Sequence, residues 1–422
     1  MKQIKINGGK PLSGEIHIGG AKNSAVALIP AALLADGISV INNVPNITDK
    51  DALFEIVKSL NCEVKMDGTV VTLDSSHIVN TTISEKLSHQ LRASYYFMGV
   101  LLAKYKHVEM YFPGGCNIGA RPIDLHLKGF EALGAKIEYN EDNHKYIISA
   151  DELIGTRIPL EFASVGATVN IMFAASLAKG ITTIENAAKE TEIINIADFL
   201  NKMGAKISGA GTSTIIIEGV ERLKATTIDV IPDRIEAGTY LLMGALLGED
   251  LVVCGVNPNH ITSLLNKLKD MGVKFSINGD KIKINKCNNL NPINITTLVY
   301  PGFPTDLGQP MSVLLTQANG VSLFEETIWE NRMQHIEYLN KMGANIILKD
   351  NTHAIINGPS KLKGSMINAT DLRGGAALVM AGLIAEGETI ISNIEYILRG
   401  YENIIRKLKN VGADIRIIKS EE

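Results

Sequence analysis

The stretch Leu133-Gly134-Ala135-Lys136-Ile137 recurs along the chain and decides the fold. It returns with small changes as Met203-Gly204-Ala205-Lys206-Ile207, Met271-Gly272-Val273-Lys274-Phe275, Met342-Gly343-Ala344-Asn345-Ile346 and Val411-Gly412-Ala413-Asp414-Ile415. A degenerate copy reads Leu60-Asn61-Cys62-Glu63-Val64. Successive copies lie about 70 residues apart, and such a period is typical of a repeated supersecondary unit. The chain is therefore predicted to contain six copies of one unit, in which equivalent positions have related roles.

An amphipathic helix pattern precedes the phrase, with apolar residues at i, i+3 or i+4, and i+7. The clearest of these predicted helices cover residues 123–133, 193–203, 260–271, 333–342 and 401–411. The glycine after each one fits the left-handed conformation that ends many helices, because glycine has no Cβ to disfavour it. A strand pattern follows each glycine.

Each repeat also has a second helix pattern, rich in Ala, Gly and Ser and apolar on all sides, which is typical of a buried helix. These six patterns cover residues 21–35, 90–103, 164–178, 233–247, 306–318 and 371–385. With the strand patterns, the unit is predicted to be strand–helix–strand–helix–strand–strand. Six units exceed the ~250–300 residues of one core. We therefore expect two α/β lobes of three repeats, one of residues 20–229 and one of residues 1–19 with 230–422.

The composition is that of an ordinary soluble globular protein, with 45% hydrophobic and 20% charged residues among 422. A net charge of -4 argues against a surface that coats nucleic acid. No apolar run reaches the ~18 residues of a membrane span, and the N-terminus has a strand pattern in place of a signal peptide. We expect a cytoplasmic protein without membrane insertion; the sequence does not indicate its oligomeric state.

The first turns of the small-residue helices carry cations at unexpected places: Lys22, Arg92, Arg234 and Arg373. A cation at a helix N-terminus opposes the helix dipole, so an anionic ligand is expected to offset that cost. Aspartates at these positions have a simpler explanation as N-caps. The loops before the other helices contain further charged residues: Arg121, Glu190, His260, Arg332 and Arg399. Several arginines with Lys22 suit a substrate with two or more phosphate or carboxylate groups, although separate surface salt bridges are the alternative.

The loop from Pro113 to Pro122 contains three glycines and Cys116. A thiol on such a loop near Arg121 is expected to be exposed and biased toward thiolate, as in a catalytic or reactive cysteine. An exposed loop cysteine can also have no function. The other cysteines (Cys62, Cys254, Cys287) have no CxxC spacing, so neither a disulfide framework nor a zinc ribbon is expected. They are interpreted as ordinary core or surface residues.

Five motifs together resemble the UDP-N-acetylglucosamine 1-carboxyvinyltransferase family of enolpyruvyl transferases. They are Gly20-Ala21-Lys22-Asn23-Ser24, the Pro113-Gly114-Gly115-Cys116 to Arg121-Pro122 loop, Ser164-Val165-Gly166-Ala167-Thr168, Phe303-Pro304-Thr305-Asp306 and Arg399-Gly400-Tyr401-Glu402. The resemblance covers the whole chain. It implies an inside-out α/β barrel of two lobes, each with three βαβαββ units, buried helices in the middle and sheets outside.

The resemblance also implies the reaction. The enolpyruvyl group of phosphoenolpyruvate moves to the 3′-hydroxyl of UDP-N-acetylglucosamine by addition and elimination, and phosphate is released. This chemistry needs an acid, a base and cationic groups, but no metal and no cofactor. Cys116 implies alkylation by the epoxide antibiotic fosfomycin.

The resemblance assigns roles residue by residue. Lys22 and Arg399 would hold phosphoenolpyruvate, with Arg121 and Arg373 completing the anion site. Asn23 would contact the transferring centre or the sugar, Asp306 would be the base, and Cys116 would donate the proton and form a covalent adduct. The remaining UDP-sugar contacts would come from Arg92, Pro122, Ile123, Asp124, Leu125, Ser164, Val165, Gly166, Ile328 and Arg332.

Three departures from the family pattern are Phe162, Gly308 and Leu398, and none removes a proposed catalytic group. The enzymatic alternative is the shikimate 3-phosphate enolpyruvyl transferase, which lacks the Gly-Gly-Cys loop. An alternative from another class is a non-catalytic UDP-sugar-binding paralogue. It would be expected to lose Lys22, Cys116 or Asp306, and all three are present.

Overall fold

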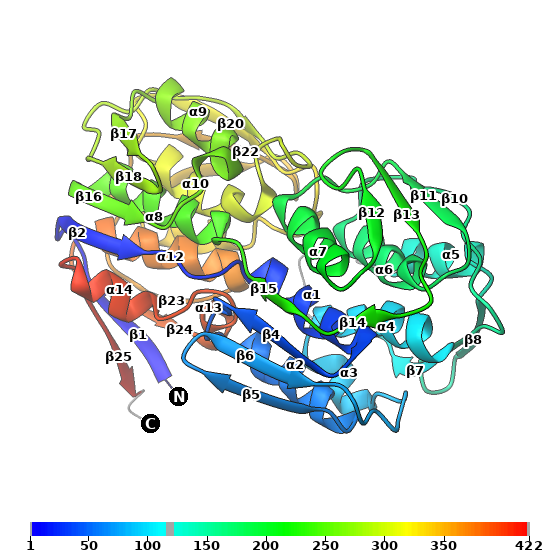
Figure 1. The fold of residues 1–422 in the computed structure, drawn as a ribbon. Coiled ribbons are helices and arrows are strands. Elements are labelled where there is room, and N and C mark those ends of the chain that lie inside the picture. The colour runs from blue at the N-terminus through cyan, green and yellow to red at the C-terminus, as the bar shows by residue number, and fades with distance from the viewer. Residues whose placement is uncertain (1, 115–121, 420–422) are drawn as a thin grey trace. The chain divides into compact units, whose positions relative to one another are not determined.

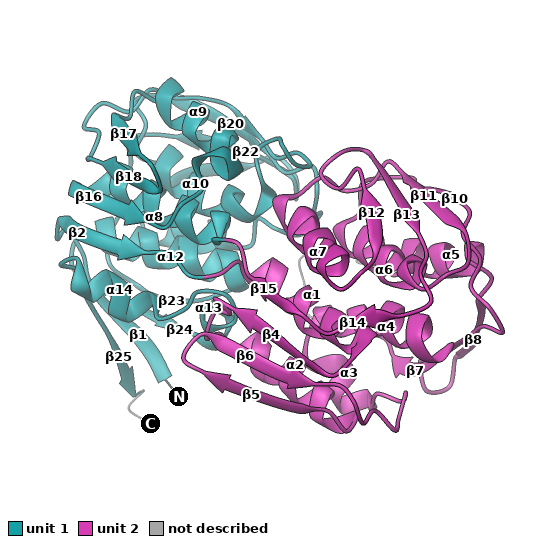
Figure 2. Ribbon diagram, in the orientation of Figure 1, with its two compact units in different colours: residues 1–19, 117–120, 232–422 teal, residues 20–116, 121–231 magenta. Residues whose placement is uncertain are grey.

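The computed structural model describes residues 2–114 and 122–419 of the chain. These residues form two compact units (Figure 2). Unit 1 contains residues 2–19 and 232–419, and unit 2 contains residues 20–114 and 122–231. Cys116 and Arg121 lie outside the described residues, so their structural roles stay predictions.

Unit 2 has three main sheets. In spatial order their strands are β15 (Thr227–Asp229), β4 (Ile38–Asn42), β6 (Val70–Asp74) and β5 (Glu63–Asp67); β7 (His107–Tyr111), β9 (Lys145–Ser149) and β8 (Lys136–Asn140); and β10 (Arg157–Pro159), β11 (Ile181–Glu185), β13 (Thr214–Glu218) and β12 (Lys206–Ser208). A two-stranded sheet pairs β14 (Leu223–Lys224) with β3 (Ala35–Asp36).

Unit 1 also has three sheets. Their strands are β2 (Leu12–His17), β16 (Gly248–Cys254), β18 (Lys281–Ile284) and β17 (Phe275–Asn278); β19 (Ile295–Thr296), β20 (Val321–Glu325), β22 (His353–Asn357) and β21 (Asn345–Leu348); and β23 (Met366–Asn368), β24 (Glu388–Ser392), β1 (Lys2–Asn7) and β25 (Asp414–Lys419). The first and last strands of the chain lie side by side in one sheet (Figure 1), with Ile4 opposite Ile417.

The six main sheets share one topology. In the four-stranded sheets the first strand runs parallel to the second, and the remaining neighbours are antiparallel. In the three-stranded sheet, a parallel bridge from Thr82 to Glu109 occupies the position of the missing strand. This common topology confirms the repeated unit that the sequence predicts.

Two sets of helices accompany the sheets. The small-residue helices are α1 (Lys22–Ala31), α4 (Tyr96–Tyr105), α6 (Val165–Ser176), α8 (Arg234–Leu247), α10 (Gly308–Leu315) and α12 (Leu372–Ile384). The amphipathic helices are α2 (Thr48–Ser59), α5 (Asp124–Ala132), α7 (Thr191–Lys202), α9 (Thr262–Asp270), α11 (His335–Lys341) and α14 (Ile404–Asn410). Two short helices, α3 (Glu85–Gln90) and α13 (Glu395–Leu398), were not predicted.

The small-residue helices form the centre of each unit. In unit 2, α4 packs against α1 and α6; in unit 1, α8, α10 and α12 contact one another. Every residue of α8 is buried, because small side chains let neighbouring elements approach on all sides. Sheets cover these helices, for example β7 on α4 and β16 on α8. The predicted α/β arrangement of inner helices and outer sheets is confirmed, although no hydrogen-bonded barrel closes among the described strands.

The repeated phrase ends its helix as predicted. Gly134, Gly204, Gly272, Gly343 and Gly412 have φ values of 101°, 107°, 85°, 106° and 104°. In the degenerate copy, Asn61 has a φ of 67°. Asparagine tolerates this left-handed region better than most residues, so the sixth copy keeps the geometry without glycine.

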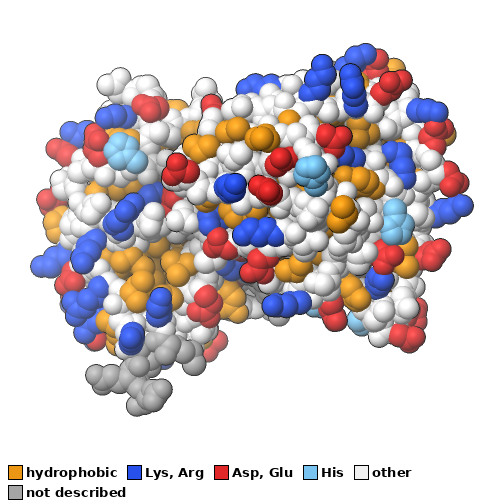
Figure 3. Space-filling model, turned by 60° about the horizontal axis from the view of Figure 1, so that its bottom comes forward, with side chains coloured by type: hydrophobic (Ala, Val, Ile, Leu, Met, Phe, Trp, Pro, Cys, Tyr) orange, Lys and Arg blue, Asp and Glu red, His pale blue; other side chains and the backbone are white. Residues whose placement is uncertain are grey.

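No helix in the described part of the chain is long and apolar enough to cross a membrane. On the face shown in Figure 3, acidic and basic side chains are interspersed.

Candidate active site

The first turn of α1 in unit 2 holds Lys22. Its Nζ lies 3.1 Å from Oδ2 of Asp49, in the first turn of α2, and both side chains are largely buried. The next residues differ in environment, because Asn23 is partly exposed whereas Ser24 is buried and donates a hydrogen bond to Asn195 on α7. A carboxylate beside Lys22 offsets part of the cost of a cation at this helix start. The sequence did not single out Asp49.

Arg92 begins a short 3-10 helix before α4, also in unit 2. Its guanidinium lies 5.7 Å from the ring centre of Tyr95 and 5.3 Å from that of Phe112. Nη1 also donates to the backbone oxygen of Pro113 at 3.3 Å. Stacking on two aromatic faces fixes the plane of the guanidinium, which is how arginine presents a directed pair of donors to an anion.

The start of α6 is packed closely around Gly166. Ser164 caps the helix by accepting a hydrogen bond from the backbone N–H of Ala167. A Cβ on Gly166 would lie 2.8 Å from both Cε1 of His126 and Oη of Tyr95, so any larger residue there requires these side chains to shift. Burial, with a smaller contribution from the Arg92 cation, lowers the pKa of His126 to about 3. His126 is therefore neutral, and its Nδ1 accepts from Asn170 at 2.8 Å.

The residues before and within the first turn of α5 alternate in exposure. Pro122 and Asp124 are exposed, whereas Ile123 and Leu125 are buried. Only the first two can therefore offer side chains to a ligand without rearrangement, while Ile123 and Leu125 can contribute backbone groups.

In unit 1, Asp306 lies between two arginines. Its Oδ1 is 2.7 Å from Nη2 of Arg332, and its Oδ2 is 3.2 Å from Nη2 of Arg373. Both guanidinium groups are buried, and the Asp306 side chain is 24% exposed. A carboxylate that is reachable from solvent, with one arginine on each oxygen, is fixed in orientation.

The aspartates at the starts of the other two small-residue helices of unit 1, α8 and α12, have different contacts. Asp233 accepts hydrogen bonds from two backbone N–H groups at the start of α8, and Asp371 does the same at the start of α12. These two residues are N-caps, as the simpler explanation predicts. The helix turn that contains Asp306 begins after Pro304, and its carboxylate is directed to arginines. Asp306 is thus distinguished from its repeat equivalents by its contacts.

Arg373 is held by more than Asp306. Its guanidinium lies 5.1 Å from the ring centre of Tyr401, which hydrogen bonds through its hydroxyl to Thr239. Burial alone would lower the pKa of Arg373, but Tyr401 and Asp306 outweigh it and raise the pKa above its ordinary value. Its Nε and Nη1 atoms are buried and have no hydrogen-bond partner among the described residues. Buried guanidinium donors without acceptors favour a carboxylate or phosphate ligand.

The buried carboxylate of Glu326 accepts hydrogen bonds from several groups close to Asp306. Its Oε1 accepts from Thr297 Oγ1 (2.9 Å) and from the backbone N–H groups of Ile328 (2.8 Å) and Trp329 (3.2 Å). Its Oε2 accepts from Thr305 Oγ1 at 2.8 Å, and Arg332 Nη1 donates to the same hydroxyl at 2.8 Å. One carboxylate therefore fixes Ile328, Thr305 and, through Thr305, Arg332.

Sequence reasoning missed Glu326 because nothing in the Glu325-Glu326 pair distinguishes the buried member except the alternation of strand β20. Arg399 follows α13 and is partly exposed. Of the three departures from the family pattern, Phe162 is exposed and Leu398 is partly buried. Gly308 is required by packing, since a Cβ there would lie 2.9 Å from the ring of Phe324.

Residues 6–408 match the EPSP synthase (3-phosphoshikimate 1-carboxyvinyltransferase) family. The chain belongs to this family of enolpyruvyl transferases. Among its relatives, UDP-N-acetylglucosamine 1-carboxyvinyltransferase of Clostridium botulinum is 48% identical over 417 residues, which cover 98% of this chain and 99% of that protein. The enzyme of the same name from Streptococcus pneumoniae serotype 2 is 49% identical over 419 residues, covering 99% and 100%.

Solved structures of enolpyruvyl transferases have the same fold. NikO from Streptomyces tendae superimposes with a TM-score of 0.91 at 25% identity, covering 100% of this chain and 99% of NikO. EPSP synthase from Acinetobacter baumannii gives a TM-score of 0.77 at 19% identity, covering 99% and 100%. The fold and family predicted from the sequence are confirmed; the roles of individual residues stay predictions.

Proposed function

We propose that this enolpyruvyl transferase moves the enolpyruvyl group of phosphoenolpyruvate to the 3′-hydroxyl of UDP-N-acetylglucosamine and releases phosphate. The observation that carries the proposal is the 48–49% identity, over nearly the full length of both chains, to enzymes named UDP-N-acetylglucosamine 1-carboxyvinyltransferase. The function would serve peptidoglycan synthesis. The buried, partly unsatisfied arginines of unit 1 support an anionic substrate.

The chemistry is an addition followed by an elimination. In the first step the methylene carbon of phosphoenolpyruvate gains a proton, the sugar oxygen bonds to the neighbouring carbon, and the 3′-hydroxyl loses its proton to a base. In the second step the methyl group loses a proton, the C=C bond re-forms, and phosphate leaves with the electron pair of the broken C–O bond. Cys116 is the proposed proton donor and Asp306 the proposed base.

The environment of Asp306 suits the role of a base that substrate binding activates. Arg332 and Arg373 each contact one oxygen of the carboxylate and hold it in one orientation. A substrate phosphate or carboxylate that binds Arg373 competes with Asp306 for that guanidinium and leaves Oδ2 able to accept the hydroxyl proton. Removing the base should slow the chemical step by about 10²–10⁴-fold while the UDP-sugar still binds.

The other proposed roles follow the family pattern. Lys22, Arg399, Arg121 and Arg373 hold phosphoenolpyruvate, and Asn23 contacts the transferring centre. The UDP-sugar is held by Arg92, Pro122, Ile123, Asp124, Leu125, Ser164, Val165, Gly166, Ile328 and Arg332. The stacked guanidinium of Arg92 and the Glu326-anchored backbone of Ile328 support the last set.

The test is phosphate release from phosphoenolpyruvate with UDP-N-acetylglucosamine as acceptor and shikimate 3-phosphate as the competing acceptor. We expect release with the UDP-sugar alone; release only with shikimate 3-phosphate would reassign the enzyme. Asp306→Asn should bind the UDP-sugar and turn over at least about 100-fold more slowly. Cys116→Asp should keep part of the activity and escape alkylation by fosfomycin, whereas Cys287→Ala should still be alkylated. A labelled Cys116→Asp protein would remove Cys116 as the target.

A further inference from the structure

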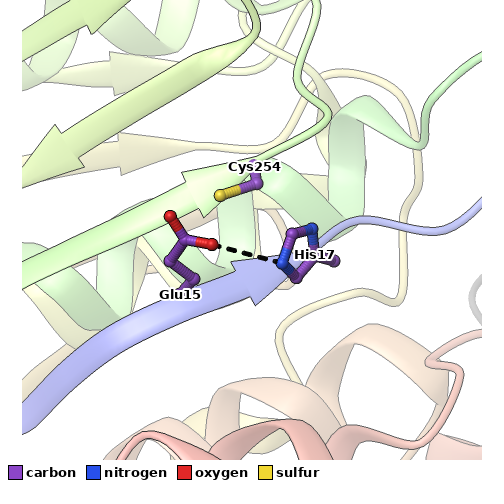
Figure 4. Close-up of side chains that lie close together, drawn as sticks. All are labelled: Glu15, His17 and Cys254. Atoms are coloured by element: carbon purple, nitrogen blue, oxygen red, sulfur yellow. Dashed lines mark ion pairs between the residues drawn. The ribbon is translucent and has the colours of Figure 1, made fainter.

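Three potential metal ligands, two from one strand and one from a distant part of the chain, meet on the outer face of one unit 1 sheet. Glu15 and His17 lie on β2, and Cys254 ends the neighbouring strand β16 (Figure 4). One carboxylate oxygen, one imidazole nitrogen and the sulfur all lie within 4.8 Å of one another. The cluster could not be predicted from the sequence, because Cys254 has no CxxC neighbour and lies more than 230 positions along the chain from Glu15 and His17.

The backbone holds the three side chains in position. The two strands are parallel, with Glu15 opposite Val252 and His17 opposite Cys254. The backbone N–H of Ile18 donates to the backbone oxygen of Cys254 at 2.9 Å. Because residues at i and i+2 of a strand share a face, Glu15 and His17 point to the same side. In Figure 4 the sulfur of Cys254 is turned toward Glu15.

We propose that Glu15, His17 and Cys254 form a zinc-binding site, with water in the remaining coordination position. Thiolate, imidazole and carboxylate are the ligands that Zn²⁺ takes in proteins, at about 2.0–2.3 Å. Tetrahedral coordination at those lengths needs ligand atoms about 3.3–3.8 Å apart, so small side-chain rotations from the present separations suffice. Magnesium and calcium prefer oxygen ligands and would not suit a thiol.

The side chains around the cluster fit this assignment. Nε2 of His17 lies 3.4 Å from Oε2 of Glu15, so the imidazole and the carboxylate already face each other. The other carboxylate oxygen, Oε1, is 3.0 Å from Nζ of Lys281. Zn²⁺ binds cysteine as the thiolate, so metal binding releases the thiol proton.

Lys281 is a competitor for Glu15 and also repels a bound cation. Replacing it with a neutral side chain should therefore tighten metal binding. A plain surface ion-pair cluster predicts no such effect, because it would have no metal to bind. The effect of this replacement therefore distinguishes a zinc site from a simple surface ion-pair cluster, in which Glu15 pairs only with His17 and Lys281.

The test uses the full-length chain, stripped of metal with a chelator and titrated with Co²⁺ and then Zn²⁺. Co²⁺ bound to a thiolate gives a charge-transfer absorption band. One equivalent of Zn²⁺ should displace the Co²⁺ and abolish this band. We expect the band to be lost in Cys254→Ala. In His17→Ala we expect the affinity for Co²⁺ to fall at least about tenfold. His17 is exposed, so that variant should fold normally.

The chain has four cysteines, which allows each thiol to be assigned. The band should persist in Cys62→Ala, Cys116→Ala and Cys287→Ala, and Lys281→Gln should bind Co²⁺ more tightly. Absence of a thiolate band in the intact chain, or its persistence in Cys254→Ala, would overturn the proposal. Because the readout is metal binding and not turnover, a failed assignment of the transferase activity would leave this result unchanged.

Discussion

Glu326 should control catalysis although we do not expect it to touch substrate. Replacing it with alanine removes the acceptor of two backbone N–H groups, those of Ile328 and Trp329, and of the hydroxyls of Thr297 and Thr305. The hydroxyls can turn to other acceptors, but the backbone N–H groups cannot. The Glu326→Ala variant therefore loses both the stability of this turn and the geometry of Arg332.

The expected loss of stability follows from those contacts. A hydrogen bond to a charged acceptor contributes about 1.5–3 kcal/mol, and an unsatisfied buried N–H costs about 1–3 kcal/mol. Two such groups give a loss of about 2–6 kcal/mol in the free energy of unfolding of unit 1. Glu326→Gln keeps the volume and one oxygen for the two backbone N–H groups, so about 1–2 kcal/mol is expected, from the lost charge on that oxygen and the lost acceptor of Thr305.

Glu326 is expected to affect catalysis because it positions Thr305, which contacts Arg332, which in turn contacts Asp306. In Glu326→Gln the side-chain amide faces the Thr305 hydroxyl as a donor, so that hydroxyl loses its acceptor while Arg332 still donates to it. A displacement of a catalytic group by about 1 Å can cost about 100-fold in rate. We expect kcat to fall by about 10–100-fold in Glu326→Gln, while most of the stability remains.

The chain provides its own reporter and its own control. Trp329 is the one tryptophan in the sequence, and its backbone N–H is bound by Glu326, so tryptophan fluorescence in a denaturant titration reports on this turn. Glu325 precedes Glu326 and is partly exposed, pairing with His353. Glu325→Gln should therefore change neither kcat nor the denaturation midpoint appreciably. If Glu326→Gln turned over as fast as Glu325→Gln, the positioning argument would be wrong, whatever the stabilities.

Three further predictions concern single substitutions, at Arg373, Gly166 and His335. Arg373→Lys should raise the KM for phosphoenolpyruvate about 10–100-fold, because lysine offers no planar fork to an anion; an unchanged KM would exclude Arg373 from the site. Gly166→Ala should destabilise unit 2 by about 1–3 kcal/mol and weaken UDP-sugar binding, since its Cβ would clash with His126 and Tyr95; calorimetry with the UDP-sugar measures both. Burial lowers the pKa of His335 to about 4, so the unfolded chain binds more protons between about pH 4 and 6.5. The stability of unit 1 should therefore fall, by about 3 kcal/mol at most, as the pH drops through that window, and His335→Gln should flatten the profile; an unchanged slope would contradict the assignment.

The repeat could be predicted from the sequence because its determinants are local. The glycine phrase needs a left-handed residue at a helix end, and an amphipathic helix needs a 3.6-residue period, so both leave marks within a dozen residues. Even the degenerate copy kept its geometry through Asn61, whose φ is 67°. The buried helices were equally visible, since a helix that is apolar on all sides has no exposed face.

Pairings between distant residues could not be predicted in the same way. The sequence has cations at the starts of the small-residue helices. From the cost of opposing the helix dipole, we predicted an anionic ligand. The structure shows that protein groups meet part of that cost, with Asp49 beside Lys22 and Asp306 beside Arg373. The cost of opposing the helix dipole therefore gives only weak support for an anionic ligand. The two buried nitrogens of Arg373 that have no acceptor among the described residues support an anionic ligand more strongly, and only the three-dimensional structure reveals them.

The contrast between Asp233, Asp371 and Asp306 shows why position in a repeat is not enough to assign a role. All three lie at the start of a small-residue helix, and that position by itself favours an N-cap for each. Asp233 and Asp371 are N-caps, because one oxygen of each accepts hydrogen bonds from two backbone N–H groups. The third begins its turn after Pro304, and its oxygens bind Arg332 and Arg373. A carboxylate bound to backbone N–H groups is committed to the helix, whereas one held by two arginines can exchange a partner for a substrate anion. That difference makes Asp306 the member of the set that can act as a base.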